Sequence, residues 1–184
     1  MAETVSSVVD RLLEVLEAGE LDYAIGGAVA LAAWSEPRAT ADVDLVLWVT
    51  GDDLDRAFDL VESAGVEFDR SASRQRATRE GLFVGYLGPI RVDVFVPSIP
   101  FYEEALARRV RTTILGRPAW IHSAEVLAVF KLLFFRPKDL LDVERMVEVQ
   151  GTAFDRDFVR AALVDLMGED ERIDRWDEIS SRHP

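Results

Sequence analysis

The chain contains no cysteine, and its 184 residues include only two histidines, His122 and His183. Without cysteine it can form no disulfide and has no thiol nucleophile, and two histidines cannot complete the usual four-ligand structural zinc site. Cysteine-based catalysis and a disulfide-stabilised fold are therefore excluded.

Long apolar runs are also missing. No apolar stretch approaches the roughly 20 residues that a membrane-spanning helix needs, and the N-terminal segment Met1–Thr4 lacks the basic start and apolar core of a signal peptide. We therefore expect a cytoplasmic protein without a membrane partner. The length and the 49% content of hydrophobic residues fit one globular domain, with room for a small helical addition.

Positive charge is scarce, with 21 Lys and Arg against 34 Asp and Glu and a net charge of −13. Nonspecific DNA binding depends on basic side chains that displace counterions, so we expect none here. Arginines still cluster in two places, at 70–79 in a segment with the composition of a loop, and at 108–111 at the end of a predicted helix. They could grip a triphosphate or an RNA acceptor, or only neutralise neighbouring acids on the surface.

Lysine is the rarest basic residue, because Lys131 and Lys138 stand against nineteen arginines. Lys131 lies in the middle of segment 123–135, which is apolar nearly all round and predicts a buried helix. A lysine there should reach an anion. The pattern favours a phosphate of a bound nucleotide; the alternative is a side chain that leaves the core at the edge of the helix.

Two acids open a strongly apolar strand predicted at 42–49. Asp42 and Asp44 lie on the same side of this strand, because side chains alternate with a period of two. Asp93 is the lone acid in a second apolar strand at 91–96. If the two strands are neighbours, the three carboxylates meet and suit a hard cation such as Mg²⁺. The alternative is a solvated strand end, since acid-x-acid pairs recur elsewhere in this acidic chain.

A glycine pair, Gly26-Gly27, follows a predicted strand at 21–25 and precedes a predicted helix at 28–34. Backbone N–H groups at the start of a helix, next to glycines that allow close approach, suit a phosphate. The alternative is an ordinary turn.

The order of predicted elements is mixed at first and helical later. We expect an α+β fold, with a mixed sheet flanked by helices in residues 1–122 and a helical part packed on it in residues 123–184. Further predicted elements are helices at 4–17, 52–64, 100–109, 123–135, 138–149, 155–167 and 170–179, hairpins at 81–96 and 112–121, and a short strand at 66–68.

These motifs resemble a known group. Gly26-Gly27, the run Arg38-x-Thr40-x-Asp42-x-Asp44, and Asp93 on a later strand are similar to the catalytic signature of the nucleotidyltransferase superfamily with the polymerase-beta-like core. Segment 131–142 resembles a downstream motif of the AbiEii-like toxin branch, including the MenT-type toxins. One departure is that many members carry Gly-Ser where this chain has Gly-Gly, so a hydroxyl contact to the phosphate is missing.

The resemblance implies the fold of that superfamily and two-metal nucleotidyl transfer with two Mg²⁺ ions, or Mn²⁺ in their place. Asp42 and Asp44 would hold both ions, and Asp93 would complete one of them and help to activate the acceptor hydroxyl. Gly26 and Gly27 would seat the triphosphate. The other residues implied at the nucleotide site are Lys131, as a phosphate contact, and Arg38, Thr40 and Asp139, which would orient the substrate or brace the site.

The activity expected first is transfer of a nucleoside monophosphate from an NTP to tRNA or a protein, as the toxin of a toxin–antitoxin pair with an antitoxin partner. Two alternatives stay open. One is a transferase for a small acceptor such as an aminoglycoside, and the other is a nucleotide-binding module without catalytic activity.

Overall fold

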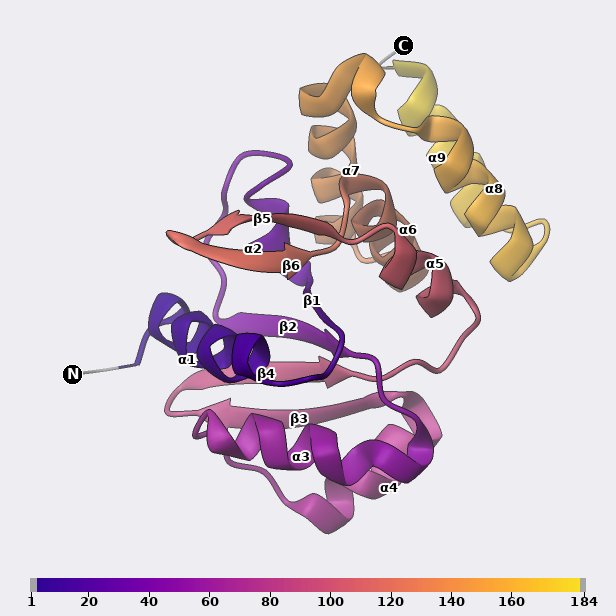
Figure 1. Ribbon diagram of the computed structural model, residues 1–184. Coiled ribbons are helices and arrows are strands. Elements are labelled where there is room, and N and C mark those ends of the chain that lie inside the picture. Colours follow the sequence, from indigo (N-terminus) through magenta and orange to yellow (C-terminus); the bar gives the residue numbers. More distant parts are fainter. Residues whose placement is uncertain (1–2, 183–184) are drawn as a thin grey trace.

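The computed structural model describes residues 3–182, and these form one six-stranded mixed sheet with helices on both faces (Figure 1). The strand order is β3-β4-β2-β1-β6-β5. The α+β fold predicted from the sequence, with a mixed sheet flanked by helices and a helical C-terminal part, is confirmed. Of the two histidines, His183 lies outside the described residues.

The six strands are β1 (Tyr23–Ile25), β2 (Asp42–Leu47), β3 (Leu82–Leu87), β4 (Ile90–Phe95), β5 (Val110–Ile114) and β6 (Arg117–Ile121). The α-helices are α1 (Val5–Ala18), α2 (Gly27–Leu31), α3 (Leu54–Ser63), α4 (Arg70–Glu80), α5 (Phe101–Ala107), α6 (Ala124–Phe134), α7 (Pro137–Gln150), α8 (Arg156–Met167) and α9 (Glu171–Arg182). Short 3-10 turns cover Gly51–Asp53 and Gly151–Ala153.

The pairing of the strands decides where the predicted site residues lie. β2 runs parallel to β4, and Asp44 stands directly opposite Asp93 in their register. β1 lies on the other side of β2, antiparallel to it and parallel to β6. The two predicted hairpins, β3–β4 and β5–β6, are both present. The ends of β1 and β6 therefore meet the beginnings of β2 and β4 at one edge of the sheet.

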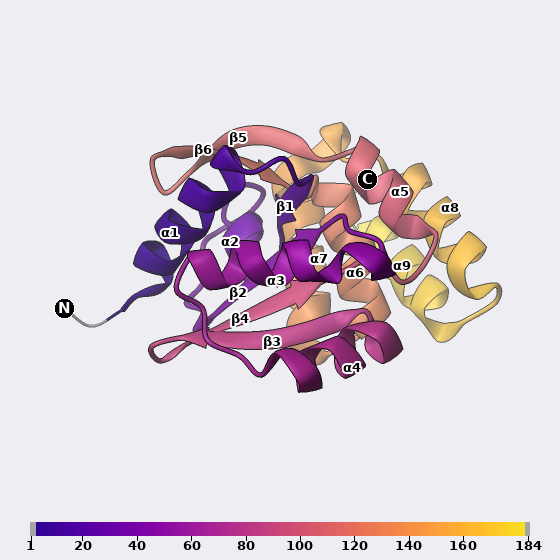
Figure 2. The same ribbon diagram turned by 60° about the horizontal axis from the view of Figure 1, so that its bottom comes forward.

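The two faces of β2 serve different purposes because its side chains alternate. Val43, Leu45 and Leu47 are fully buried in the hydrophobic core that the sheet shares with α1. α1 and α3 pack against each other and cover this face (Figure 2). Asp42, Asp44 and Val46 point the opposite way and line a cavity beneath α6. One face of β2 therefore packs in the hydrophobic core, and the other face lines the cavity.

Helix α4 corrects the prediction of a loop for the arginine-rich segment 70–79. Its side chains are polar almost all round, and Ser73 and Ala77 are its only buried residues in the described chain. No hydrophobic stripe therefore marks the helix in the sequence. It forms because its residues are good helix formers, because the Asp69 side chain accepts a hydrogen bond from Ala72 N, and because Gly81 ends it in the left-handed region.

The predicted short strand at 66–68 is also wrong. Glu67 alone pairs with Tyr86, as an isolated bridge beside β3.

The C-terminal helices α6 to α9 gather at one end of the molecule (Figure 1). α6 contacts α7, α8 and α9, and it also contacts α2 from the N-terminal part. A domain boundary at residues 122 and 123 stays a prediction. Within residues 3–182, every helix is too short or too polar to cross a membrane.

Candidate active site

A cavity of about 330 Å³ lies between the sheet and helix α6. Its charged lining comes from three acids of the strands and from residues of the surrounding loops and helices: Asp42, Asp44, Arg91, Asp93, Arg38, Lys131, Arg136, Lys138 and Asp139. The rest of the lining is mostly apolar or aromatic: Val46, Leu82, Phe95, Tyr102, His122, Leu127, Phe130 and Phe134. Gly26, Gly27 and Ala28 complete the lining.

The three predicted acids all line this cavity. Asp44 and Asp93 are brought together by the register of β2 and β4, and Asp42 lies two residues before Asp44 on the same face. This grouping depends on parallel pairing between strands that are separated in sequence by α3, α4 and β3. Asp93 is 9% exposed, whereas Asp42 and Asp44, for which the alternative was a solvated strand end, are each partly buried, so a metal site at this pair stays a prediction.

Each flanking acid has a partner of its own. Nε of Arg91 donates to Oδ1 of Asp93 at 2.7 Å, and the Thr40 hydroxyl donates to a carboxylate oxygen of Asp42. Among residues 3–182, no three acidic, histidine or cysteine side chains are arranged as a ready-made metal site. The carboxylates share one cavity without converging on a common point.

The electrostatics of the cavity nevertheless suit a cation. Burial, together with the negative charges of Asp42 and Asp93, raises the pKa of Asp44 to about 6. Burial likewise raises the pKa of Asp93, against the opposing effect of Arg91. Neighbouring carboxylates raise one another's pKa because their negative charges repel, and a divalent cation relieves this repulsion. Mg²⁺ prefers oxygen donors of this kind. The donor set therefore fits Mg²⁺ by its chemistry.

The glycine pair packs directly against Asp44. Gly26 N donates to the backbone oxygen of Asp44 at 2.8 Å. Gly27 has a φ of +53°, and a Cβ placed on it would lie 1.7 Å from Oδ2 of Asp44. Glycine is required here to leave room for the carboxylate. The helix that follows, α2, has five residues rather than the predicted seven, and a phosphate seat at this turn stays a prediction.

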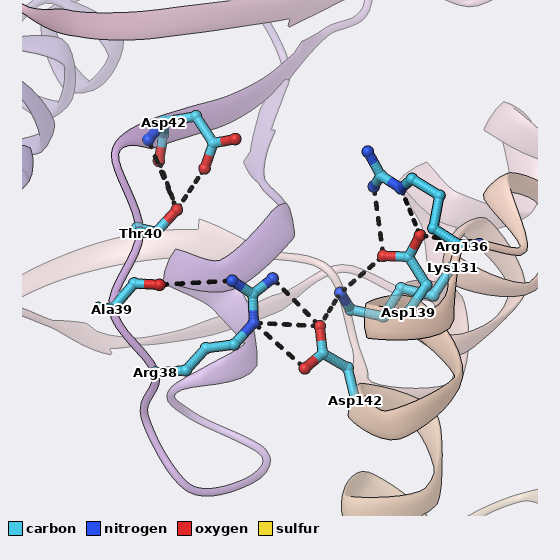
Figure 3. A network of polar contacts seen from close by, with 8 residues as sticks. All are labelled: Arg38, Ala39, Thr40, Asp42, Lys131, Arg136, Asp139 and Asp142. Carbon is cyan, nitrogen blue, oxygen red and sulfur yellow. Dashed lines mark hydrogen bonds and ion pairs between the residues drawn. The ribbon is translucent and has the colours of Figure 1, made fainter.

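Beside the acids, a chain of ion pairs joins the loop before β2 to α6 and α7 (Figure 3). Arg38 contacts both carboxylate oxygens of Asp142, at 3.1 to 3.2 Å. Nζ of Lys131 donates to Oδ2 of Asp142 at 2.6 Å and lies 3.6 Å from Asp139. Arg136 pairs with Asp139 in turn. Three members of the chain are nearly fully buried, so these contacts fix the wall of the cavity.

Lys131 does reach an anion, as its apolar surroundings required, but the anion in this structure is Asp142. The alternative of a side chain that leaves the core is wrong, because Lys131 is only 5% exposed. Contact between Lys131 and a phosphate stays a prediction. Arg38 and Asp139 belong to the same chain of contacts, and their predicted roles at a nucleotide site stay predictions.

Some cavity residues were not found from the sequence. Arg91 could have been, because it precedes Asp93 by two residues and shares its face of the strand. His122 could not, since a single histidine between a strand and a helix carries no signal of the cavity it lines. Asp142 is the last residue of segment 131–142, which resembles the toxin motif, but the sequence did not indicate its partners.

The two arginine clusters neutralise acids. Within α4 and its surroundings, Arg70 pairs with acids of α3, Arg74 pairs with Asp55, and Arg76 and Arg79 pair with Glu80. In the second cluster the pairs are Arg108 with Glu104, Arg109 with Asp22, and Arg111 with Glu17. The predicted alternative of charge compensation at the surface describes both clusters.

Comparison with known proteins shows the fold alone. No protein-family model matches the chain, and no curated protein matches it in sequence. The solution structure of the antibiotic-resistance factor ANT(2'')-Ia is 18% identical, with a TM-score of 0.65 over 90% of this chain and 94% of that one. Its crystal structure with adenylyl-2''-tobramycin is 16% identical, with a TM-score of 0.60 over 99% and 100%. Lincomycin-bound LnuA, a lincosamide antibiotic adenylyltransferase, is 12% identical, with a TM-score of 0.54 over 81% and 99%.

Proposed function

We propose that this chain is a nucleotidyltransferase that moves a nucleoside monophosphate from an NTP to an acceptor hydroxyl. The observation that carries the proposal is that Asp42, Asp44 and Asp93, from two neighbouring strands, line one cavity that also holds basic side chains. A nucleoside triphosphate with its metal needs carboxylates that bind the metal ion. It also needs basic side chains nearby that bind the phosphates.

In this proposal Asp42 and Asp44 hold two Mg²⁺ ions, and Asp93 completes the coordination of one of them. The ions, when bound, would neutralise charge on the attacking and leaving oxygens of the phosphoryl group. Asp93 would have to exchange Arg91 for the metal, because Nε of Arg91 now donates to its carboxylate. Arg91 would then be free to contact a phosphate oxygen.

The reaction balances without a further reactant. The acceptor hydroxyl oxygen forms a bond to the α-phosphorus, the bond from that phosphorus to the pyrophosphate oxygen breaks, and pyrophosphate leaves. Asp93 would accept the hydroxyl proton. Gly27 would offer its backbone N–H to the triphosphate beside Asp44, whereas Gly26 N already donates to the backbone oxygen of Asp44.

A small molecule is the acceptor that we place first. The arginines of both clusters are paired with acids, so they offer little free positive charge to an RNA backbone. The net charge of −13 suits a cationic acceptor. The solved structures with a similar fold include proteins named for antibiotic resistance and antibiotic adenylylation.

The toxin role is the second candidate. It depends on the resemblance of segment 131–142 to the AbiEii-like and MenT-type toxins, and would bring tRNA or a protein as acceptor and an antitoxin as partner.

The test is transfer with purified protein, Mg²⁺, each of the four NTPs, and separate panels of aminoglycosides, lincosamides and tRNA. Pyrophosphate release and the mass of the acceptor report turnover. We expect a nucleotidylated small molecule, and loss of turnover in Asp44→Asn and Asp93→Asn. Asp177→Asn, at a surface ion pair with Arg160 on α8 and α9, is the matched control.

A modified tRNA without a modified drug would move the toxin role to first place. NTP binding by calorimetry without turnover on any acceptor would support the non-catalytic module. Turnover by Asp44→Asn equal to that of the wild type would contradict the proposal.

A further inference from the structure

His122 is a buried polar residue whose ring has no hydrogen-bond partner. The residue is 2% exposed, and across residues 3–182 neither Nδ1 nor Nε2 finds a donor or acceptor. Buried polar groups are almost always paired, and an unpaired one is costly. His122 also lines the cavity that holds the three acids. These facts point to a hydrogen-bond partner that a ligand supplies.

The backbone of His122 is held firmly at the edge of the sheet. His122 N donates to the backbone oxygen of Ile25 at 3.1 Å, and its own backbone oxygen accepts from Nε1 of Trp34 at 2.8 Å. Gly26 is next to the ring, since a Cβ there would lie 3.3 Å from Cδ2 of His122. The imidazole therefore sits beside the glycine turn that packs on Asp44.

The surroundings of the ring are aromatic. Its centroid lies 5.2 Å from that of Phe130 and 6.2 Å from that of Trp48, and Tyr102 packs against both of these. Burial lowers the pKa of His122 to about 3, so the imidazole is neutral at physiological pH. A neutral imidazole carries one N–H donor and one acceptor nitrogen. The cavity around His122 thus offers ring surfaces and an uncharged imidazole that can both donate and accept a hydrogen bond.

We propose that the part of the cavity around His122, Phe130 and Tyr102 binds the nucleobase of the NTP, with His122 as the residue that hydrogen-bonds the base and sets base preference. The inference rests on the proposed function. A base has flat faces that stack on aromatic rings, and its edge carries both donors and acceptors.

The first test replaces His122 by Phe, which keeps a ring without nitrogen atoms, and by Asn, which keeps one donor and one acceptor. We expect His122→Phe to reduce discrimination between the preferred NTP and the other three, as the ratio of kcat/KM values, by about three- to tenfold. His122→Asn should restore part of it. Equal discrimination in wild type and His122→Phe would overturn the inference.

The second test measures the NMR signals of the His122 ring nitrogens and does not depend on turnover. The chain has two histidines, so ¹⁵N-histidine labelling gives two sets of ring signals, and His183→Gln assigns them. ATP, GTP, CTP and UTP are added in turn, with ribose 5-phosphate and inorganic triphosphate as controls without a base. We expect a shift of the His122 ring nitrogens that depends on the base.

The outcomes separate the two proposals. NTP binding by calorimetry with unchanged His122 signals overturns the base contact and leaves the proposed function standing. Equal shifts with ribose 5-phosphate, or a shift with an aminoglycoside and none with any NTP, also overturn it. If no NTP binds with Mg²⁺ or Mn²⁺ present, the proposed function and this inference both fail.

Discussion

Gly27 lies so close to the carboxylate of Asp44 that there is no room for a side chain at position 27. A Cβ on Gly27 would lie 1.7 Å from Oδ2 of Asp44. Gly27→Ala therefore has to displace the carboxylate, and it also places alanine at a φ of +53°. We expect a loss of about 1–3 kcal/mol in the free energy of unfolding, together with loss of transfer. Urea denaturation and the transfer assay measure both.

Gly26→Ala is the matched control for this change. Gly26 has a φ of −117°, and its nearest contact for a new Cβ is 3.3 Å, to His122. If both alanine variants lose the same stability and activity, then the fit between Gly27 and Asp44 is not what makes glycine necessary.

Asp44→Asn should make the metal-free protein more stable while it abolishes transfer. Because the folded pKa of Asp44, about 6, lies above the ordinary 3.8, the folded state binds the extra proton between these values. The contribution of this group to stability therefore falls as pH rises from about 4 to 6. At pH 8, with a chelator present, we expect a gain of up to about 3 kcal/mol in urea denaturation.

At pH 4 most of that gain should vanish, because the wild-type carboxyl is then protonated in the folded state. If Asp44→Asn raises the free energy of unfolding equally at pH 4 and pH 8, then the charge of Asp44 does not cause the difference in stability. Mg²⁺ should stabilise the wild type and leave Asp44→Asn nearly unchanged.

Asp142→Asn tests the chain of ion pairs beside the cavity. It leaves Lys131 buried with Asp139 at 3.6 Å as its remaining carboxylate, and it deprives Arg38 of its partner. Removing one member of a buried pair costs about 3–5 kcal/mol. We expect a loss in the lower part of that range by urea denaturation, because Asp139 partly compensates.

Asp177→Asn, which breaks an exposed pair with Arg160, should cost no more than about 1 kcal/mol. The double variant Lys131→Met/Asp142→Leu should lose less stability than the sum of its single changes, because neither Lys131 nor Asp142 is then left buried without the other. Additive losses would contradict direct coupling between the two residues.

The burial of His122 gives the fold a sensitivity to acid. The folded pKa, about 3, lies below the ordinary 6.5, so the unfolded state takes up the proton first. Stability from this residue is complete above pH 6.5 and falls by about 1.4 kcal/mol per pH unit below it. Compared with His122→Phe, the wild type should lose on the order of 3 kcal/mol more between pH 7 and pH 4. Parallel stability curves for the two proteins would refute a buried neutral imidazole.

The residues that sequence could identify are those with a local pattern. Asp42, Asp44 and Asp93 were found because a charge in an apolar strand with period two is costly unless it serves a site, and the register of β2 and β4 then brought two of them together. The amphipathic helix α1 and both hairpins also follow from short-range periodicity and glycine turns.

The features that sequence could not provide depend on distant contacts. The partner of Arg38 lies 104 positions away, at Asp142, and nothing local indicates it. His122 is buried by rings of Trp48 and Phe130 from other elements. Helix α4 was missed for the opposite reason: its stability comes from capping and helix propensity, with no apolar stripe to reveal it.

The contact between Arg38 and Asp142 also has a consequence for the timing of biosynthesis. Arg38 is translated early and Asp142 late, and both anchor the same wall of the cavity. A nascent chain that stops short of α7 can form strands but leaves Arg38 and Lys131 without their common carboxylate. Nascent chains that end before Asp142 would therefore lack the contact that completes this wall of the cavity.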